Sequence, residues 1–496
     1  MFFAWPLVTL FSTGVTGDGI RALFQKPAIR SVAWFTLWQA MASTALTVAV
    51  GLIPAYVVAR YRFPGRRAFL AVVTVPFVLP TVVVGAAFLA LLPESWHQTV
   101  GRSCSPTSSS TSPWWCAPSA ACRGQLDRGV EEAARTLGAS TWQVARHITL
   151  PILRPAIVAA ASIVFLFTFT SYGVVTVLGG PRHPTLEVEL YRRAVLLGDL
   201  PLAAAIGLAQ LLVVAALLGW WGTLQARAGT VRLRSHGQRP PVGRQRFTVA
   251  TVVVMTTVAL GAPVLRLVQR SFQGRDGWTL AWWRSILDDG AGTVWTSLRF
   301  AVLAALVATA IGLAAATAVS TSGRLARLLD SGLMLPLGTS AVTLGFGILI
   351  TFDHDPVDFR ASWFVIPIAH ALVGIPFVVR IVAPVLRSID PKLREAAAVL
   401  GASPFRVWWE VDRRIIQRPA AAGAGFAMAV SLGEFGATSF LTRRGSRTIP
   451  IEIADALSRP GAASFGRGTA LASLLLVLSA VVVLLVDRLA PDGRSW

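Results

Sequence analysis

The chain has 496 residues, of which 54% are hydrophobic and only 14% are charged, and its mean hydropathy is +0.62. A typical soluble domain carries about 25% charged residues, so this composition excludes an ordinary soluble protein. The formal net charge of +21 would suit a nucleic-acid-binding protein, but the arginines gather in short segments between apolar stretches. That distribution indicates membrane orientation instead. We therefore expect an all-α polytopic membrane protein that contacts the lipid bilayer and binds no nucleic acid.

Apolar stretches long enough to cross a bilayer recur along the chain. A transmembrane helix needs about 20 mostly apolar residues. The first 15 residues are short for a span and are interrupted by Pro6, which a start codon assigned too late would explain. The sequence predicts spans within 34–59, 68–93, 155–181, 200–226, 247–265, 300–323, 331–352, 361–379, 419–441 and 469–486.

The two halves of the chain repeat the same landmarks at the same spacing. The matched intervals are Thr36 to Gly51 with Ser297 to Gly312, Pro76 to Gly85 with Pro336 to Gly345, and Gly173 to Thr185 with Gly436 to Thr448. From this register we predict a first repeat over 1–226, a basic cytoplasmic linker over 227–246 and a second repeat over 247–496. Each repeat is expected to contain about six transmembrane helices.

The arginines predict the orientation of both repeats. With the N-terminus inside, five arginine-bearing segments between the predicted spans all face the cytoplasm, which agrees with the positive-inside rule. These segments are 60–67, 127–154, 227–246, 324–330 and 390–418. An even number of spans per half returns the second copy to the same side, so the repeat is parallel. Many secondary transporters contain inverted repeats instead, and the predicted topology therefore argues against that class.

A short motif occurs once in each half, within a predicted cytoplasmic segment. Residues 129–140 read GVEEAARTLGAS and residues 393–403 read LREAAAVLGAS. Small alanines allow another surface to approach closely, and a glycine can end a short helix. Apolar residues follow each glycine, Trp142 and Val144 in one copy and Phe405 and Val407 in the other. The motif residues are Glu132, Ala133, Ala134 and Gly138 in the first copy and Glu395, Ala396, Ala397 and Gly401 in the second.

This motif resembles the cytoplasmic "EAA" loop of ABC-importer permeases, and the duplication is similar to fused permeases of the ferric-iron and thiamine type. The resemblance implies the multi-pass subunit of an ATP-driven, binding-protein-dependent importer in the bacterial inner membrane. It also implies two ATP-binding subunits that dock on the motif helices. A periplasmic or extracellular substrate-binding protein would be received by the external segments 179–193 and 442–461. No Walker A sequence occurs, so we expect ATP hydrolysis in a partner, and no catalytic residue or cofactor in this chain.

Glu434 is the one acid within a predicted span. A charge at the bilayer centre costs about 2.5 kcal/mol or more unless it is paired or faces water. The sequence leaves two interpretations open: Glu434 lines the translocation path, or it is a hydrogen-bond partner between helices. The alternative function, an ion-coupled secondary transporter, needs coupling carboxylates within spans, and only Glu434 is available. A membrane enzyme needs a catalytic or metal cluster, which the six scattered histidines do not provide.

One segment breaks the repeat. The first half should contain a span between 93 and 127, but 103–122 reads SCSPTSSSTSPWWCAPSAAC and contains all three cysteines. With codons chosen for a GC-rich gene, the neighbouring reading frame turns 105–122 into LAHVFFNLAVVVRTVGGL. The histidine and arginine of that string are ten residues apart, as are His370 and Arg380. We therefore predict that 103–122 results from a local frameshift that was later compensated.

Overall fold

The protein is almost entirely helical in the residues that its computed structural model describes, which confirms the predicted all-α class. The only other regular element there is a small antiparallel hairpin of β1 (Gln273–Gly274) and β2 (Gly277–Trp278). The described residues are 2–15, 17–92, 133–178, 183–227, 240–275, 277–320, 323–353, 359, 362–443 and 445–489.

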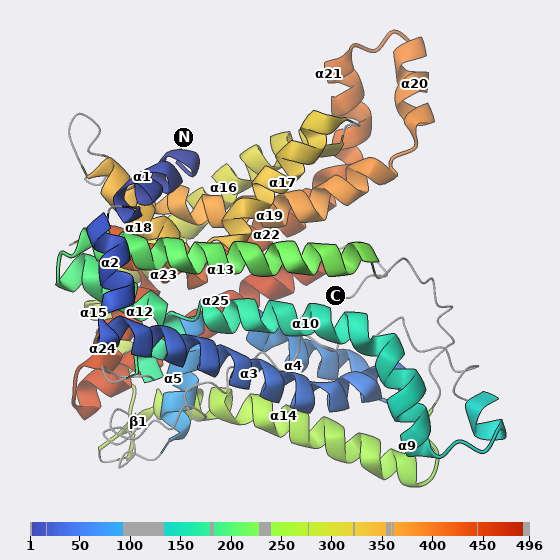
Figure 1. Ribbon diagram of the computed structural model, residues 1–496, viewed down its shortest axis with the longest axis horizontal. Helices are drawn as coiled ribbons and strands as arrows, with labels where there is room; N and C mark the ends of the chain where they lie inside the picture. The colour runs from blue at the N-terminus through green and yellow to red at the C-terminus, as the bar shows by residue number, and fades with distance from the viewer. Residues whose placement is uncertain are drawn as a thin grey trace.

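The helices follow one another in a similar order in the two halves (Figure 1). The first half contains α1 (Ala4–Gly14), α2 (Gly17–Gln25), α3 (Pro27–Arg60), α4 (Arg66–Val78), α5 (Thr81–Leu91), α9 (Thr141–Val144), the π-helical turn η3 (Ala145–Thr149), α10 (Leu150–Phe169), α11 (Gly173–Leu178), α12 (Leu186–Tyr191), η4 (Arg192–Leu196) and α13 (Leu200–Arg227). The second half contains α14 (Arg244–Arg270), α15 (Ala281–Asp288), α16 (Ala291–Ser320), α17 (Arg324–Gly338), α18 (Ala341–Phe352), α19 (Val365–Ser388), α20 (Pro391–Val399), α21 (Pro404–Val407), η5 (Trp408–Asp412), α22 (Arg413–Gly433), α23 (Gly436–Leu441), α24 (Ile449–Ser458) and α25 (Ala462–Leu489).

Seven helices in the described part of the chain are long and apolar enough to cross a membrane. They are Pro27–Arg60, Trp142–Phe169, Leu200–Trp220, Arg244–Arg270, Ala291–Ser320, Val365–Ser388 and Ala462–Val486. The helices α5 and α18 are apolar but shorter. The span predicted between 93 and 127 in the first half lies outside the described residues, as does the whole of 103–122.

Four stretches that the sequence predicted as single spans are each divided into two helices: 68–93, 155–181, 331–352 and 419–441. Local chemistry explains two of these breaks. Pro80 lies at the start of α5, and a proline disfavours the helical conformation of the residue before it. Ser340 begins α18, because its hydroxyl accepts a hydrogen bond from the amide of Val342 at 3.1 Å. A continuous helix through either position was therefore the wrong prediction.

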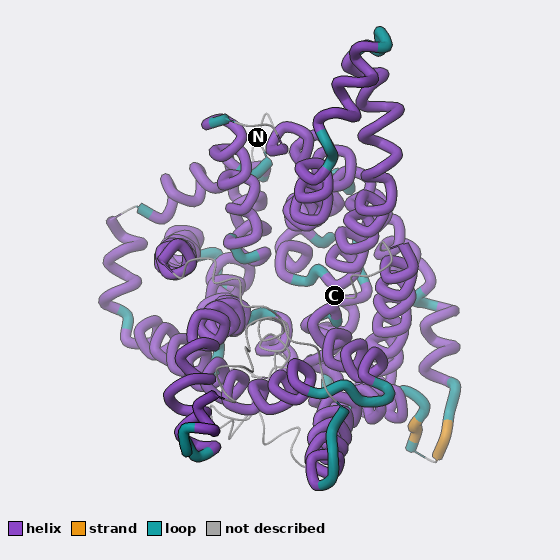
Figure 2. Tube along the Cα trace, turned by 90° about the vertical axis from the view of Figure 1, so that its right-hand side faces the viewer, coloured by secondary structure: helices purple, strands orange, loops and turns teal. Residues whose placement is uncertain are grey.

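The two motif copies lie at the same end of the helical bundle. Figure 1 shows α9, α20 and α21 at one end, and α2, α12, α15, α24 and the hairpin at the other. Figure 2, turned by 90°, views the bundle from the end that carries the motifs. We call these the motif end and the opposite end. A parallel repeat requires that both copies share one end, and an inverted repeat would separate them.

The first helix of each half packs against the other half. The helix α1 contacts α18 as well as α13, and α14 contacts α5 as well as α25. The contact of α1 with α18 is close, because a Cβ atom added at Gly347 would lie 3.2 Å from the Cβ of Pro6. Pro6 does not interrupt α1, as the sequence had suggested, since it lies in the first turn, where a proline breaks no helical hydrogen bond.

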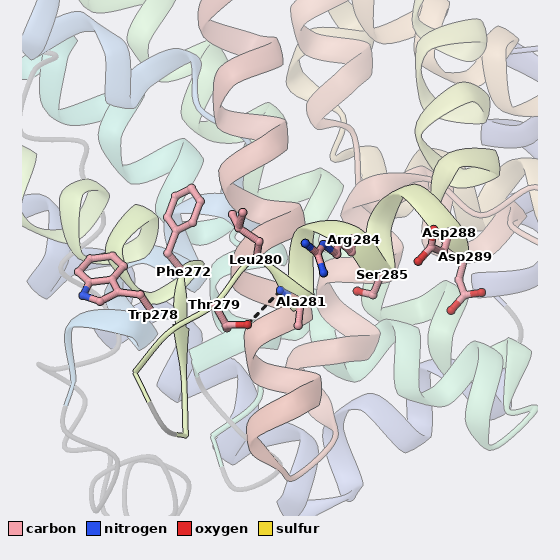
Figure 3. Close-up of a pocket in the computed structure, with 9 residues that line it drawn as sticks. All are labelled: Phe272, Trp278, Thr279, Leu280, Ala281, Arg284, Ser285, Asp288 and Asp289. Carbon is pink, nitrogen blue, oxygen red and sulfur yellow. Dashed lines mark hydrogen bonds between the residues drawn. The ribbon is translucent and has the colours of Figure 1, made fainter.

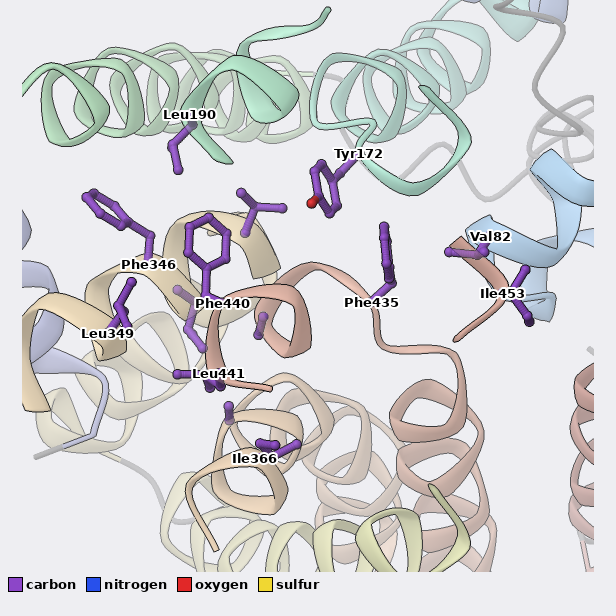
Figure 4. Packing of buried hydrophobic residues seen from close by; sticks show 14 of the residues in the cluster. Val82, Tyr172, Leu190, Phe346, Leu349, Ile366, Phe435, Phe440, Leu441 and Ile453 are labelled. Carbon is purple, nitrogen blue, oxygen red and sulfur yellow. The ribbon is translucent and has the colours of Figure 1, made fainter. Parts of the chain in front are cut away.

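Small residues bring the central helices of the second half together. A Cβ atom added at Gly374 of α19 would lie 3.2 Å from Ala308 of α16 and 3.0 Å from Ala427 of α22. Close backbone approach of this kind is typical of helix packing within membranes, where small residues replace the hydrophobic drive. A larger cluster of buried apolar residues joins the two halves and contains aromatic rings from both (Figure 4).

Candidate functional site

The second motif copy is a short helix that projects from the bundle (Figure 1). Asp390 caps α20, accepting a hydrogen bond from the amide of Lys392 at 3.0 Å, and no residue of α20 is buried. At the other end, the amides of Leu400 and Ala402 donate to the carbonyls of Ala396 and Ala397, each at 3.1 Å. Gly401 has φ +81°, the left-handed conformation that commonly terminates helices. The predicted role of this glycine as a helix terminator is therefore confirmed.

The first copy ends in the same hydrogen-bond pattern. The amide of Leu137 donates to Ala133 at 3.2 Å, and that of Ala139 donates to Ala134 at 3.0 Å. Gly138 has φ +89°. Glu132 lies outside the described residues, so the structure places Ala133, Ala134 and Gly138 but not the glutamate of this copy. Both glycines have open space beside the α-carbon, since a Cβ atom added at either would meet nothing within 4 Å.

The match continues beyond the glycines. Ser140 and Ser403 each accept a hydrogen bond from the amide three residues later, at 3.3 and 3.4 Å. A π-helical turn follows at the same register, η3 in the first copy and η5 in the second. The sequence did not predict these turns.

Each copy also presents a leucine and an aromatic side chain to solvent at equivalent positions. Leu137 and Leu400 are 88% and 86% exposed, and Trp142 and Phe405 are 71% and 70% exposed. Exposed apolar groups at equivalent places on a projecting loop indicate a surface that a partner covers.

Beyond these shared features the two loops differ. Phe405 stacks near Trp408 and Trp409, at centroid distances of 6.3 and 6.1 Å, and the guanidinium of Arg413 lies 3.9 Å from the centre of the Trp409 ring. The first copy has Ala145 and Arg146 where the second has the two tryptophans. Only the second loop therefore carries an aromatic cluster.

Glu434 lies in the break between α22 and α23, and its buried carboxylate is fully engaged. It accepts hydrogen bonds from the amides of Ala437 and Thr438, at 2.8 and 2.9 Å, and from the Thr438 hydroxyl at 2.6 Å. The Nε2 atom of His370, on α19, lies 3.3 Å from the same carboxylate. The other ring nitrogen of His370 is 2.7 Å from the hydroxyl of Ser431. Glu434 thus caps α23 and links it to α19.

A ladder of contacting aromatic rings begins at Phe435, the residue after Glu434, and Figure 4 labels three of its rings, Tyr172, Phe435 and Phe440. Tyr172 and Phe435 stack at 5.0 Å between centroids and 20° between planes. The ladder continues from Tyr172 to Tyr191 at 5.9 Å, and from Tyr191 to Phe440 at 5.3 Å. None of these rings was among the residues predicted from the sequence. The repeat register contained the signal, because Tyr172 and Phe435 each precede a matched glycine.

At the opposite end, α12 and α24 are fixed to the long helices in the same way. The first amide of α12, that of Leu186, donates to the Thr36 hydroxyl at 3.0 Å. The first amide of α24, that of Ile449, donates to the Ser297 hydroxyl at 2.7 Å. These two helices belong to the repeated segments that were predicted to face outside, and their positions relative to α3 and α16 are equivalent.

An open hollow of about 650 Å³ lies beside the hairpin at the opposite end (Figure 3). Its lining combines the exposed Trp278 with Arg284, Asp288 and Asp289. The hollow is formed by the hairpin and α15 alone, so it is a surface feature and not an entrance between the halves.

Comparison with known families explains the duplication. A family model described as the binding-protein-dependent transport system inner membrane component matches residues 47–269 and again residues 308–495. The chain belongs to this family. It is therefore the membrane-spanning permease of a binding-protein-dependent ABC importer, and it is a transporter component, not a catalytic subunit. The ion-coupled alternative receives no support.

Full-length relatives agree. The permease is 26% identical over 515 residues to the probable ABC transporter permease protein y4fN of Sinorhizobium fredii, a match that covers 95% of this chain and 90% of the relative. It is 26% identical over 491 residues to the thiamine transport system permease protein of Brucella abortus, covering 94% and 88%. The corresponding protein of Escherichia coli strain K12 is 23% identical over 512 residues, covering 96% and 92%.

Proposed function

We propose that this permease imports thiamine across the cytoplasmic membrane of a bacterium. Relatives that match nearly the whole chain are named as thiamine transport system permeases, in Brucella abortus and in Escherichia coli. Ferric iron, the other substrate that the sequence analysis considered, has less direct support.

The motif end faces the cytoplasm in this proposal, and each loop receives one ATP-binding subunit. The observation that carries this assignment is the equivalence of the two copies: both end in a left-handed glycine, and both expose a leucine and an aromatic ring at matching positions. In the first copy the contact would be made by Glu132, Ala133, Ala134 and Gly138, and in the second by Glu395, Ala396, Ala397 and Gly401. ATP hydrolysis takes place in those subunits, and their movement is transmitted through the loops as rigid-body motion of α10 and α22.

The opposite end receives the substrate-binding protein. Each helix takes part in an ion pair there: the buried Glu189 of α12 with Arg193 at 2.6 Å, and Glu452 of α24 with the more exposed Arg447 at 3.2 Å. The binding protein would engage both helices across the centre of the molecule. The predicted repeat boundaries, 1–226, 227–246 and 247–496, remain part of this proposal, with 227–246 as a cytoplasmic tether.

Of the two interpretations of Glu434, we favour the helix–helix partner. Both of its oxygens accept hydrogen bonds inside the protein, and a third group, His370, adds to the network. Its contribution to transport would then be to hold α19, α22 and α23 in register.

The proposal can be tested in cells that lack their own thiamine importer. Expression of the permease together with the ATP-binding and binding-protein genes that neighbour it should restore uptake of radiolabelled thiamine. Omission of the ATP-binding gene should abolish that uptake. Uptake of ferric iron in place of thiamine, by the same complex, would overturn the substrate assignment but leave the importer class intact.

A further inference from the structure

Equivalent residues of the two halves meet at the centre of the permease. Tyr172 follows α10 and Phe435 follows α22, each in a break of two or three residues before a short helix. Their stacked rings are both buried. Because each ring is carried by one half, movement of the halves apart must separate the rings, and a flat molecule can then enter between them.

Two buried carboxylates lie near this stack. Glu434 directly precedes Phe435, and Glu187 lies on α12, the helix that also carries Tyr191, whose ring is 5.9 Å from that of Tyr172. Glu434 is engaged by α23 and His370. Glu187, on α12, is 0% exposed and its Oε1 atom accepts a hydrogen bond from the Gln210 amide at 2.6 Å.

Glu187 is buried without a cationic side chain beside it. In the described part of the chain no lysine or arginine pairs with it, and its hydrogen-bond partners, Gln210 and Ser340, are neutral. Burial of a carboxyl group without a cation favours its neutral form, so a positive charge that arrives from outside the protein would stabilise the carboxylate at this site. The second half has Pro450 at the equivalent position, so the repeated fold does not require an acid there.

We propose that the Tyr172–Phe435 stack, together with Glu187, is a transit site that selects a flat aromatic cation during import. The faces of the two rings attract a cation and stack on a planar ring, and Glu187 supplies the opposite charge. Thiamine, which carries a positively charged thiazolium ring, has this chemistry. The inference rests on the proposed function and adds the place at which the substrate is recognised within the membrane.

The experiment uses the whole importer, reconstituted in proteoliposomes with its ATP-binding subunits and binding protein. Uptake of radiolabelled thiamine is measured beside ATP hydrolysis stimulated by the loaded binding protein. The variants are Tyr172→Leu and Phe435→Leu, which remove the ring but keep an apolar side chain, and Glu187→Gln, which keeps the side-chain shape. Tyr172→Phe is the conservative variant. The matched control is Phe165→Leu, which removes a ring stacked on Phe169 at 5.6 Å within α10, a helix that packs on α3 and α13 of its own half.

Loss of either central ring should lower thiamine uptake about tenfold, the effect of losing one buried cation–π contact. Glu187→Gln should raise the KM for thiamine. Tyr172→Phe and Phe165→Leu should transport like the unchanged protein, and stimulated ATP hydrolysis should persist in every variant.

Other results would contradict the proposal in distinct ways. Normal uptake by the two leucine variants would overturn the site and leave the thiamine assignment standing. Joint loss of uptake and stimulated ATP hydrolysis would assign the rings to packing of the halves alone. An assembled, unchanged importer that hydrolyses ATP but takes up no thiamine would overturn the proposed function. The same result would remove the reason for assigning a flat aromatic cation to the Tyr172–Phe435 stack.

Discussion

The rings of Tyr172 and Phe435 stack on each other although the two residues belong to different halves of the chain. Each directly precedes a matched glycine, Gly173 at the start of α11 and Gly436 at the start of α23. Equivalent residues can touch only where the axis that relates the halves passes between them. The stack therefore marks the centre of the permease, where movement of one half relative to the other has its most direct effect on a passing substrate.

The hydroxyl of Thr36 should contribute measurably to stability. It accepts the hydrogen bond of the Leu186 amide, a buried donor at the start of α12. In Thr36→Val the side chain keeps its shape but that amide loses its partner, which should cost about 1–3 kcal/mol. Thermal unfolding of the purified permease, and hydrogen exchange at Leu186, measure the effect.

Thr44→Val is the matched control for this prediction. The Thr44 hydroxyl only donates to the Ala40 carbonyl within the same helix, so its removal leaves no amide unpaired. Equal destabilisation by the two variants would show that the contact between α3 and α12 has no special role.

Gly138→Asp and Gly401→Asp should each uncouple transport from ATP hydrolysis. Both glycines have positive φ and face open space, so the aspartate adds backbone strain and a charge at the surface that we assign to the ATP-binding subunits. We expect thiamine uptake to fall, and co-purification with the ATP-binding subunits to weaken, while the permease still inserts in the membrane.

Gly65→Asp separates docking from strain. Gly65 has φ +75° and open space around it, but it lies between α3 and α4, outside both motif copies. It should transport normally. If Gly65→Asp were as damaging as the two motif variants, backbone strain alone would explain all three results.

Replacement of Glu434 should distinguish its two interpretations. In Glu434→Ala the amides of Ala437 and Thr438 lose their acceptor, so we expect a loss of several kcal/mol and poor recovery of folded protein. Glu434→Gln keeps one acceptor oxygen but turns its NH2 group toward the other donors, so it should lose less stability than Glu434→Ala. Size-exclusion chromatography after a heating series reads out stability, and an uptake assay follows. A Glu434→Gln variant that is as stable as the unchanged protein but does not transport would favour a role in the translocation path.

Cysteine labelling should find the two motif copies on the same side of the membrane. In a chain whose native cysteines are replaced, Leu137→Cys and Leu400→Cys present exposed thiols at the motif end, and Leu287→Cys presents one at the opposite end. A membrane-impermeant reagent added to intact cells should modify the last but not the first two. Modification of only one motif position would contradict the parallel repeat.

The sequence was sufficient for features that depend on local composition. Apolar stretches predicted the long helices, and the Glu-Ala-Ala motif with its glycine predicted where α20 ends. Features that depend on distant contacts could not be predicted in this way. The partners of Glu434 include His370, which is far from it in sequence, and the break at Ser340 depends on a single hydroxyl cap. The equivalence of Tyr172 and Phe435 could have been predicted, because the repeat register aligns them, but only the fold shows that their rings stack.

The last prediction concerns 103–122, which lies outside the described residues. In the second half, α19 packs between α16 and α22, and the register of the repeat assigns its counterpart to the region that contains this segment. As written, the segment would place Pro106, Pro113 and Pro118 and many hydroxyl groups in lipid, where unsatisfied polar groups are costly. Without a crossing there, the first motif copy would be carried to the outside, away from any ATP-binding subunit.

We therefore expect the bases of the gene to encode an apolar span in the neighbouring frame, close to LAHVFFNLAVVVRTVGGL. A gene with that frame restored should give more inserted permease and higher thiamine uptake than the chain as written, in a host that lacks its own importer. The control is a span of scrambled order and equal composition, which restores the crossing but not the histidine and arginine that match His370 and Arg380. Stop codons in the neighbouring frame, or full transport by the chain as written, would show that 103–122 is a genuine part of the permease.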